Sequence, residues 1–377
     1  MPDQPSNDEV VATALAGRRV LVTGHSGFKG GWLCLWLESL GAEVVGISLP
    51  PPTVPSFYHS AGIGGLVDSR IADIRDVKAL QRAAEGVDAD ILFHLAAQPI
   101  VRRSHRHPAE TFDINVTGTA NVLDIARAMP SMRAAIVVTS DKCYDDRGSA
   151  TPYRETDRLG GTDPYSASKA CTELVAECYR RNWFASPGGP QLATVRAGNV
   201  IGGGDWAEDR LIPDIIRAAH SRSPMVIRNP RSIRPWQHVL EPLSGYLLLA
   251  ARLLGDDGPA CSGPWNFGPA DTSGADAETI ARAIMQAAPE LDLPVEFASG
   301  VAALHEAAVL RLDSSKAFAG LGWQPRLSMQ QTIKLTAEWY AASLRGAADM
   351  RAISRDQLAS YLDLGSSLRT EGVSICA

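Results

Sequence analysis

The chain has 377 residues, of which 45% are hydrophobic and 21% are charged, and its net charge is -6. This is the composition of an ordinary soluble globule, long enough for one large domain or two joined ones. The negative charge disfavours nonspecific binding to nucleic acid or anionic membranes, and no apolar run approaches the roughly 18 residues of a membrane span, so we expect neither kind of partner.

The two ends of the chain carry little apolar patterning. Residues 1–17 show no basic region followed by a hydrophobic stretch, so we expect a flexible tail, no secretory signal and a cytoplasmic protein. Residues 346–377 are polar and uneven, and two alternatives stay open for them, a tail or a docked helix. The six cysteines lack the spacing of a zinc site, which predicts no metal and a reducing compartment.

The first element with a clear pattern is a short buried strand, Arg19–Thr23, followed by a glycine-rich turn and a helix over 28–40. The turn places Gly24, Gly27 and Gly30 at regular spacing. Glycines let the backbone approach a pyrophosphate closely, and a helix N-terminus offers unpaired N–H groups to an anion. The pattern therefore predicts a dinucleotide site; the alternative is an ordinary glycine-rich turn.

Strands alternate with helices through the first half of the chain. Further strands are predicted over 43–48, 66–71, 90–95, 134–140 and 192–198, and further helices over 76–84, 111–128 and 164–184. This alternation predicts an α/β fold, a Rossmann-type doubly wound parallel sheet that binds ligands at the carboxyl ends of its strands. After about residue 200, glycines and prolines predict loops and short elements, including 255–270. Helices are predicted there over 209–221, 241–254, 274–288 and 328–344.

A tyrosine and a lysine four residues apart, Tyr165 and Lys169, follow the helix-start signal Asp163-Pro164. Positions i and i+4 share a helix face, so both side chains can point at one substrate atom. A nearby cation favours the phenolate, so we expect Lys169 to lower the pKa of Tyr165 and make it a base. The alternative is an ordinary pair on a solvated helix face.

The glycine turn and the Tyr/Lys pair together resemble the extended short-chain dehydrogenase/reductase superfamily. Longer segments resemble one family within it, the CDP-glucose 4,6-dehydratases, over about residues 17–345. These segments are Lys29 inside the glycine turn, 52–56, 140–144, 196–206 and 233–239.

The resemblance implies a smaller, discontinuous C-terminal substrate lobe beside the Rossmann-type sheet. We expect residues 18–200 to form a NAD-binding domain that carries the catalytic residues, and residues 201–345 to form mainly the sugar-nucleotide lobe. The flanking segments, 1–17 and 346–377, are expected as described above.

The resemblance also implies a three-part reaction on a hexose: oxidation at C4, loss of water across C5 and C6, and return of the hydride to C6. Tyr165 would take the C4 hydroxyl proton, Lys169 would hold the cofactor ribose, and Ser140 would bond to the C4 oxygen. We expect Asp141 to be the acid and Lys142 the base of the water loss, with burial holding Asp141 protonated and Lys142 neutral. The alternative for these two is a structural ion pair at a strand end.

NAD is the cofactor that the resemblance implies. The predicted second strand ends at Ser48 and Leu49 without the acid that often contacts the cofactor ribose. Two expected contacts have alternatives, because Lys29 is also consistent with a solvated side chain and Asp73 with a turn residue. The expected contacts are Gly24, Gly27, Phe28, Lys29, Gly30, Asp73, Ile74, Leu95, Ala96, Ala97, Tyr165 and Lys169.

The expected substrate is a nucleotide sugar, CDP-glucose by resemblance, used to make deoxysugars for surface polysaccharide such as O-antigen. Gln98 is expected between cofactor and sugar, and Asn199 and Arg234 are expected on the diphosphate. The 145–152 loop lacks aromatic residues common in the family, which leaves the nucleotide sugar open. Two alternatives are a 4,6-dehydratase or 4-epimerase acting on another nucleotide sugar, and a noncatalytic NAD(P)-sensing regulator. The two long helices of the first half are expected to pair with their copies in a homodimer or homotetramer.

Overall fold

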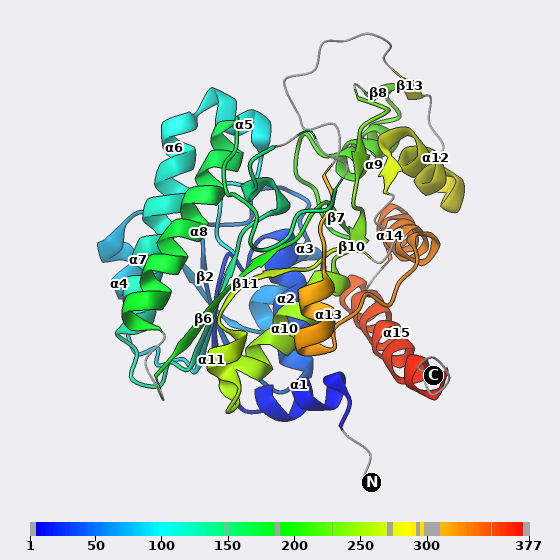
Figure 1. The fold of residues 1–377 in the computed structure, drawn as a ribbon. Helices are drawn as coiled ribbons and strands as arrows, with labels where there is room; N and C mark the ends of the chain where they lie inside the picture. The colour runs from blue at the N-terminus through cyan, green and yellow to red at the C-terminus, as the bar shows by residue number, and fades with distance from the viewer. Residues whose placement is uncertain are drawn as a thin grey trace.

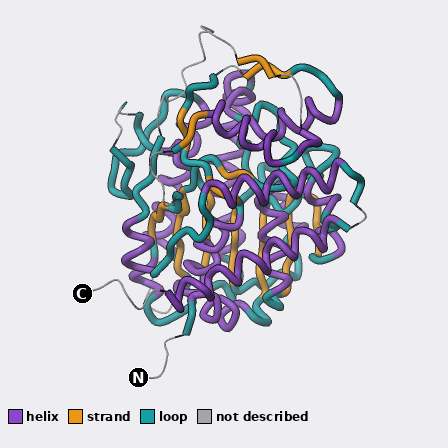
Figure 2. The backbone as a smooth tube through the Cα atoms, turned by 90° about the vertical axis from the view of Figure 1, so that its right-hand side faces the viewer, coloured by secondary structure: helices purple, strands orange, loops and turns teal. Residues whose placement is uncertain are grey.

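A computed structural model describes residues 5–146, 148, 151–184, 189–227, 229–269, 274–291, 295–297, 310–347 and 349–371. At its centre lies one seven-stranded sheet covered by helices (Figures 1 and 2). All neighbouring strands in it are parallel, which confirms the predicted Rossmann-type sheet. In spatial order the strands are β11 (Gly263–Asn266), β6 (Gln191–Arg196), β5 (Ala134–Val138), β4 (Ile91–His94), β1 (Arg19–Thr23), β2 (Glu43–Ser48) and β3 (Asp68–Ile71).

Successive side chains of the central strands point to opposite faces of the sheet, as the pleat requires. Val20 and Val22 of β1 belong to one buried cluster, and Leu21 between them belongs to another. The first cluster also contains residues of α2 (Phe28–Ser39) and α10 (Leu240–Leu254). The second contains residues of α4 (Val77–Ala83), α7 (Gly118–Arg127) and α8 (Pro164–Trp183). Both faces are therefore covered, which explains why the strands are continuous apolar runs in the sequence.

The strand β11 is one of the short elements predicted within 255–270, and its place in the main sheet is new. It pairs with β6 at one edge of the sheet. Pro264 is tolerated there because only one side of an edge strand carries a hydrogen-bonded ladder. Trp265 is buried and fixes the strand to the core. A segment from the second half of the chain thus completes the sheet of the first half.

The rest of the second half consists of short strand pairs and helices. Three two-stranded sheets join β7 (Val200–Ile201) to β10 (Gln237–His238), β9 (Ile233–Arg234) to β12 (Ala275–Asp276), and β8 (Met225–Ile227) to β13 (Val295–Phe297). The helices here are α9 (Leu211–Ser221), α11 (Gly258–Cys261), α12 (Ala277–Ala287), α13 (Ser315–Leu321) and α14 (Met329–Leu344). The four helices predicted in this half are confirmed, with ends shifted by a few residues.

The helix predicted over 111–128 begins earlier and is interrupted. It consists of α6 (Pro108–Phe112), a π-helical turn (Asp113–Thr117) and α7. A π turn inserts an extra residue into a helix and is frequent at functional sites. The remaining short elements are α3 (Phe57–Ser60), α5 (Val101–Arg106) and 3-10 turns at Ile63–Gly65, Asp141–Cys143 and Pro289–Leu291.

The N-terminal segment forms a docked helix, α1 (Asn7–Leu15), so the predicted flexible tail over 1–17 is wrong for these residues. A capping box starts the helix: Ser6 Oγ accepts from the Glu9 N–H at 2.9 Å, and the Glu9 carboxylate accepts from the Ser6 N–H at 2.6 Å. Val11 and Leu15 are buried in the cluster that contains α10. Their partner surface lies more than half the chain away, but the Ser6–Glu9 capping box is a local signal that the prediction overlooked.

The C-terminal segment forms α15 (Met350–Glu371), which confirms the docked-helix alternative. Leu358 and Tyr361 are buried, and Tyr361 Oη donates to Glu241 Oε2 of α10 at 2.8 Å. Among the helices that the structure describes, none has the length and apolar character to cross a membrane.

Leu15→Ala is expected to lower the free energy of unfolding by about 2–4 kcal/mol, because it leaves a cavity where α1 meets α10. Thr13→Ala, on the exposed side of the same helix, should change it by less than about 0.5 kcal/mol. Urea unfolding followed by circular dichroism measures both. If Leu15→Ala were as stable as the parent chain, α1 would not dock in solution.

Candidate active site

Several strand ends and one helix end meet at the carboxyl edge of the sheet. Because β1, β4, β5 and β6 are parallel, the segments that follow them lie at the same edge. Lys169 Nζ donates to the Val138 carbonyl at the end of β5, 3.2 Å away. The Ser140 side chain acts on the pKa of Tyr165 and donates a hydrogen bond to Asp141. The structure thus brings these predicted site residues together.

The glycine turn after β1 brings the backbone close to the segment after β4. Gly24 has a φ of +79°, and a Cβ there would lie 2.7 Å from the Ala96 nitrogen and against Leu95, so only glycine fits. A Cβ on Gly30 would collide with the Gly24 carbonyl. Gly27 caps α2 without a side-chain hydrogen bond, so no side chain of the cap competes for the first N–H groups of the helix. This cradle fits a dinucleotide pyrophosphate.

Lys29, in the first turn of α2, points inward, beside a half-buried Phe28. Its Nζ donates to Tyr246 Oη over 3.4 Å and lies 5.5 Å from the centre of that ring. Burial, followed by the positive charges of Arg210 and Lys169, lowers the pKa of Lys29 to about 7. The alternative of a solvated first-turn side chain is therefore wrong, and Lys29 adds a titratable amine to the site.

Tyr165 and Lys169 are both buried, which excludes an ordinary pair on a solvated helix face. Burial raises the pKa of Tyr165 to about 12, although the Ser140 side chain acts in the opposite direction. Burial lowers the pKa of Lys169 to about 8, although the Glu173 carboxylate raises it. The predicted lowering of the Tyr165 pKa is therefore wrong for the protein alone. The phenol is neutral at neutral pH and needs a further positive charge to act as a base.

Asp141 and Lys142 stand in the 3-10 turn that Ser140 caps. The Ser140 hydroxyl donates to Asp141 Oδ1 at 3.0 Å and accepts from the Lys142 N–H at 3.2 Å. Asp141 Oδ2 is buried, and no described residue forms a hydrogen bond with it. Burial raises the pKa of Asp141, although the charge of Lys142 acts the other way. No ion pair joins the two side chains within the described chain, which argues against the structural alternative.

Of the predicted substrate residues, Gln98 is already engaged inside the protein. Its Nε2 donates to Thr111 Oγ1 at 3.0 Å, and its Oε1 accepts from the Ile100 N–H at 2.6 Å. Arg234 is buried, and its charge acts on Asp141. Arg234 therefore lies on the acid side of the site, and the sugar contact of Gln98 stays a prediction.

Asn199 is half-buried and follows Gly198, a glycine that leaves room for the Asp141 carboxylate. A Cβ on Gly198 would collide with Asp141 Oδ2 and lie 2.8 Å from Pro235 Cγ. The Asn199 carbonyl accepts from the Gln237 N–H at 3.3 Å, which ties this segment to β10. The backbone around Asn199 thus forms one wall beside Asp141.

Asn115, in the π-helical turn, connects parts of the site but was not predicted as a site residue. Its Oδ1 accepts from the Gln98 N–H at 2.8 Å, and its Nδ2 donates to Ser168 Oγ at 2.9 Å. Ser168 lies between Tyr165 and Lys169 on α8, so Asn115 fixes the loop after β4 to that helix. No spacing rule marks this residue in the sequence, and only its contacts identify it.

The predicted cofactor contact Asp73, which follows β3, is engaged by Arg75. The Arg75 guanidinium donates to both Asp73 oxygens at 2.6–3.1 Å and lowers the pKa of that carboxyl, which favours the turn-residue alternative. Ile74 is buried against α7.

At the end of β2, Ser48 Oγ lies 3.1 Å from His25 Nδ1, and burial lowers the pKa of His25 to about 4. The strand ends at Ser48, where the sequence has no carboxylate.

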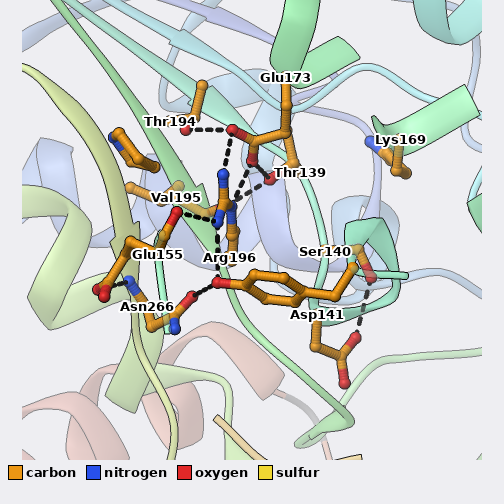
Figure 3. Close-up of polar contacts among 12 residues, drawn as sticks. Thr139, Ser140, Asp141, Glu155, Lys169, Glu173, Thr194, Val195, Arg196 and Asn266 are labelled. Atoms are coloured by element: carbon orange, nitrogen blue, oxygen red, sulfur yellow. Dashed lines mark hydrogen bonds and ion pairs between the residues drawn. The ribbon is translucent and has the colours of Figure 1, made fainter. Parts of the chain in front are cut away.

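Behind the site lies a buried carboxylate–guanidinium pair that the sequence patterns did not predict (Figure 3). Glu173 of α8 accepts two hydrogen bonds from Arg196 of β6, both of 2.8 Å. Glu173 follows Lys169 by one helical turn on the same face of α8. The pair therefore connects the helix that carries Tyr165 to the core of the sheet.

Comparison with known proteins gives a consistent result. The NAD dependent epimerase/dehydratase family matches residues 20–259. A CDP-glucose 4,6-dehydratase of Salmonella typhimurium is 46% identical over 355 residues, which covers 92% of this chain and 96% of that protein. The solved UDP-glucose 4-epimerase of Thermotoga maritima has a TM-score of 0.74 at 22% identity, covering 86% of this chain and 99% of its own. The solved structure of the NDP-hexosamine 5,6-dehydratase TunA has a TM-score of 0.69 at 23% identity, covering 86% of this chain and 98% of its own.

Gly198→Ala is expected to lower the free energy of unfolding by about 1–3 kcal/mol, because the new methyl group overlaps Asp141 and Pro235. Gly255→Ala is the matched control, since a Cβ there makes only an ordinary contact of 3.5 Å. Chemical denaturation compares the two. Equal stabilities would mean that the Asp141 carboxylate does not lie against Gly198.

Proposed function

Because the chain belongs to the NAD dependent epimerase/dehydratase family, we propose that it is a hydro-lyase that dehydrates CDP-D-glucose to CDP-4-dehydro-6-deoxy-D-glucose. The product would serve deoxysugar and surface polysaccharide synthesis. One observation carries the proposal: a buried Asp141 oxygen without a partner among the described residues stands beside Lys142, at the sheet edge where Ser140, Tyr165 and Lys169 meet. The similar Salmonella protein supports the choice of CDP-glucose.

When bound, NAD supplies the hydride acceptor and donor and a positive charge that favours the Tyr165 phenolate. The glycine turn and the N-terminus of α2 are proposed to hold its pyrophosphate, with Leu95–Ala97 beside it. Lys169 is proposed to hold the nicotinamide ribose. Asp73 and Ile74 are proposed to lie near the adenine, with Asp73 held in place by Arg75.

In the first part of the reaction, Tyr165 takes the proton of the C4 hydroxyl. Ser140 donates a hydrogen bond to the C4 oxygen as it becomes a carbonyl oxygen. Because its pKa is about 8, Lys169 is mostly protonated at neutral pH, and its charge stabilises the phenolate.

In the second part, the C4 ketone acidifies the C5 proton, which Lys142 takes as the base. Asp141 gives its proton to the C6 hydroxyl, which leaves as water, so that a C5=C6 double bond forms. When C6 is reduced, Lys142 returns a proton to C5. The raised pKa of Asp141 supports its role, because a buried neutral carboxylic acid has a proton to give.

The alternatives are less consistent with these residues. A 4-epimerase needs no acid and base for water loss, so the pairing of Asp141 with Lys142 favours a dehydratase. A noncatalytic regulator has no need for Ser140, Tyr165 and Lys169 in hydrogen-bonded positions. A dehydratase of another nucleotide sugar stays the second candidate, because the 145–152 loop lacks aromatic residues that are common in the family.

For the substrate, we propose that residues 201–345 form mainly the sugar-nucleotide lobe, and that residues 18–200 bind NAD and carry the catalytic side chains. Asn199 and Arg234 are proposed to contact the diphosphate, and Gln98 to lie between cofactor and sugar. The position of Arg234 close enough to act on Asp141 supports a substrate that extends from the acid toward the second half of the chain.

A homodimer or homotetramer is proposed to form through α7 and α8. On α8, Leu174 and Trp183 are 61% and 43% exposed, and a helix–helix interface would cover both.

A cytoplasmic location is also proposed, supported by five free cysteines among the described residues.

Incubation of the purified chain with NAD and CDP-, dTDP-, GDP- or UDP-glucose tests the function. We expect loss of one water from CDP-glucose, detected by mass, and little or none from the other three. Turnover of another nucleotide would move the substrate assignment and keep the chemistry. No product from any of the four would contradict the proposal.

Lys142→Met is expected to stop the reaction after C4 oxidation, because the C5 proton then has no base. Enzyme-bound NADH should accumulate, as measured by its near-ultraviolet absorbance, and product formation should fall by at least about a hundredfold. Lys334→Met, at a side chain that is 71% exposed, is the matched control and should behave as the parent chain. Full turnover by Lys142→Met would exclude Lys142 as the base.

A further inference from the structure

The buried Glu173–Arg196 pair uses every hydrogen-bonding position of its carboxylate (Figure 3). Glu173 Oε1 accepts from Arg196 Nε at 2.8 Å and from Thr139 Oγ1 at 2.5 Å. Its Oε2 accepts from Arg196 Nη2 at 2.8 Å and from Thr194 Oγ1 at 2.6 Å. A buried ion pair is costly unless its hydrogen bonds are complete, and here they are complete on the carboxylate side. Such a directional network fixes positions better than an apolar contact of the same size.

The guanidinium extends the network to the segment that follows the acid and base. Arg196 Nη1 donates to Tyr144 Oη at 2.8 Å, and Tyr144 Oη donates to Asn266 Oδ1 of β11 at 2.7 Å. The guanidinium also lies 4.8 Å from the centre of the Tyr144 ring, which stacks on Tyr153 at 4.8 Å between centres. Tyr144 is thereby held at its ring and at its hydroxyl.

Tyr144 directly follows the 3-10 turn that contains Asp141 and Lys142. The turn therefore has two fixed ends: Ser140, which follows strand β5, and Tyr144, which the network holds. Two side chains of the turn have less support, because Asp141 bonds only through Oδ1 and Lys142 is half-exposed. The position of both depends on how firmly the ends of the turn are held.

We propose that the Glu173–Arg196–Tyr144 hydrogen-bond network is a positioning device that holds the Asp141–Lys142 turn in register with the helix that carries Tyr165 and Lys169. The inference rests on the proposed function. In that function the turn and the helix act on neighbouring carbons of one sugar, so their relative position matters. Glu173, Arg196 and Tyr144 are positioning residues and touch no reacting atom. Their effect reaches the reaction through the turn and through α8.

The network also acts on the charge of the site. Glu173 lies one helical turn from Lys169, and its carboxylate raises the pKa of that amine, which burial alone would lower further. The same carboxylate is held by Arg196, so its charge and its position are fixed together. Lys169 therefore stays mostly protonated at neutral pH although it is buried.

The two steps of the reaction are expected to respond differently to loss of the network. C4 oxidation uses Tyr165 and Lys169, which lie on helix α8, and Ser140, which follows strand β5. Regular secondary structure therefore holds these three residues directly. The water loss uses Asp141 and Lys142, whose turn is held at its far end by Tyr144. Breaking the network at Tyr144 should therefore slow the water loss more than the oxidation.

Tyr144→Phe tests this, because it removes two hydrogen bonds and keeps the ring that packs on Arg196 and Tyr153. We expect C4 oxidation at nearly the rate of the parent chain, water loss slowed by about tenfold, and reduced nicotinamide accumulating in the near-ultraviolet spectrum during turnover. Tyr179→Phe is the matched control: it removes a hydroxyl that donates to the Ala120 carbonyl at 3.3 Å near the other end of α8. It should show no such accumulation.

Two results would overturn the inference: parent-like kinetics in Tyr144→Phe, or equal slowing of both steps. A parent chain that forms no product from any nucleotide glucose would instead contradict the proposed function, so the two failures are distinguishable. Urea unfolding of Tyr144→Phe measures whether the variant has lost stability, which would slow both steps together. An unchanged stability would mean that only the position of the Asp141–Lys142 turn has changed.

Glu173→Gln gives a second readout that a purely structural role does not predict. Without the carboxylate, the pKa of Lys169 falls below about 8, so Lys169 loses its proton at lower pH. The alkaline limb of the pH profile for C4 oxidation should then move to lower pH. An unshifted limb in a folded variant would contradict the role of Glu173, and if the variant does not fold, Tyr144→Phe decides the matter.

Discussion

The site depends on the parallel order of β1, β4, β5 and β6, because parallel strands deliver their following segments to the same edge of a sheet. A glycine turn, a short 3-10 turn and the wall around Asn199 meet there, although the glycine turn lies more than a hundred residues before the other two. α8 lies across one face of the sheet, and its first two turns bring Tyr165 and Lys169 to this edge. The second half of the chain then adds β11 and α10, which close the sheet and its other face.

Burial is the physical effect that turns this arrangement into a reactive site. Removal from water lowers the pKa of Lys29 to about 7 and of Lys169 to about 8, and it raises the pKa of Asp141. Three groups whose ordinary pKa values are far apart are thereby shifted toward neutral pH, where proton transfer in either direction is easy. Tyr165 is shifted the other way, to about 12, so the protein alone does not prepare the phenolate.

Local sequence patterns were enough to predict the elements that carry the site, because each pattern lies within one turn or helix. Gly24 to Gly30 and the Tyr165–Lys169 spacing are of this kind. The helix α1 was missed although Ser6 and Glu9 form a capping-box pattern, because its few apolar residues pack on α10 far along the chain. The place of β11 in the main sheet was not predicted because Gly263 and Pro264 disfavour strands in general, and only the edge position permits them. The Glu173–Arg196 pair joins residues 23 positions apart without any motif, so only the folded chain shows it.

The central claim is that one site oxidises C4, removes water across C5 and C6, and returns the same hydrogen to C6. CDP-glucose labelled with deuterium at C4 tests it most directly, with mass spectrometry and proton magnetic resonance locating the label in the product. The account predicts deuterium at C6 and a hydrogen from solvent at C5, where Lys142 exchanges its proton with water. A product without deuterium at C6, with the label released into solvent or into free cofactor, would contradict the account.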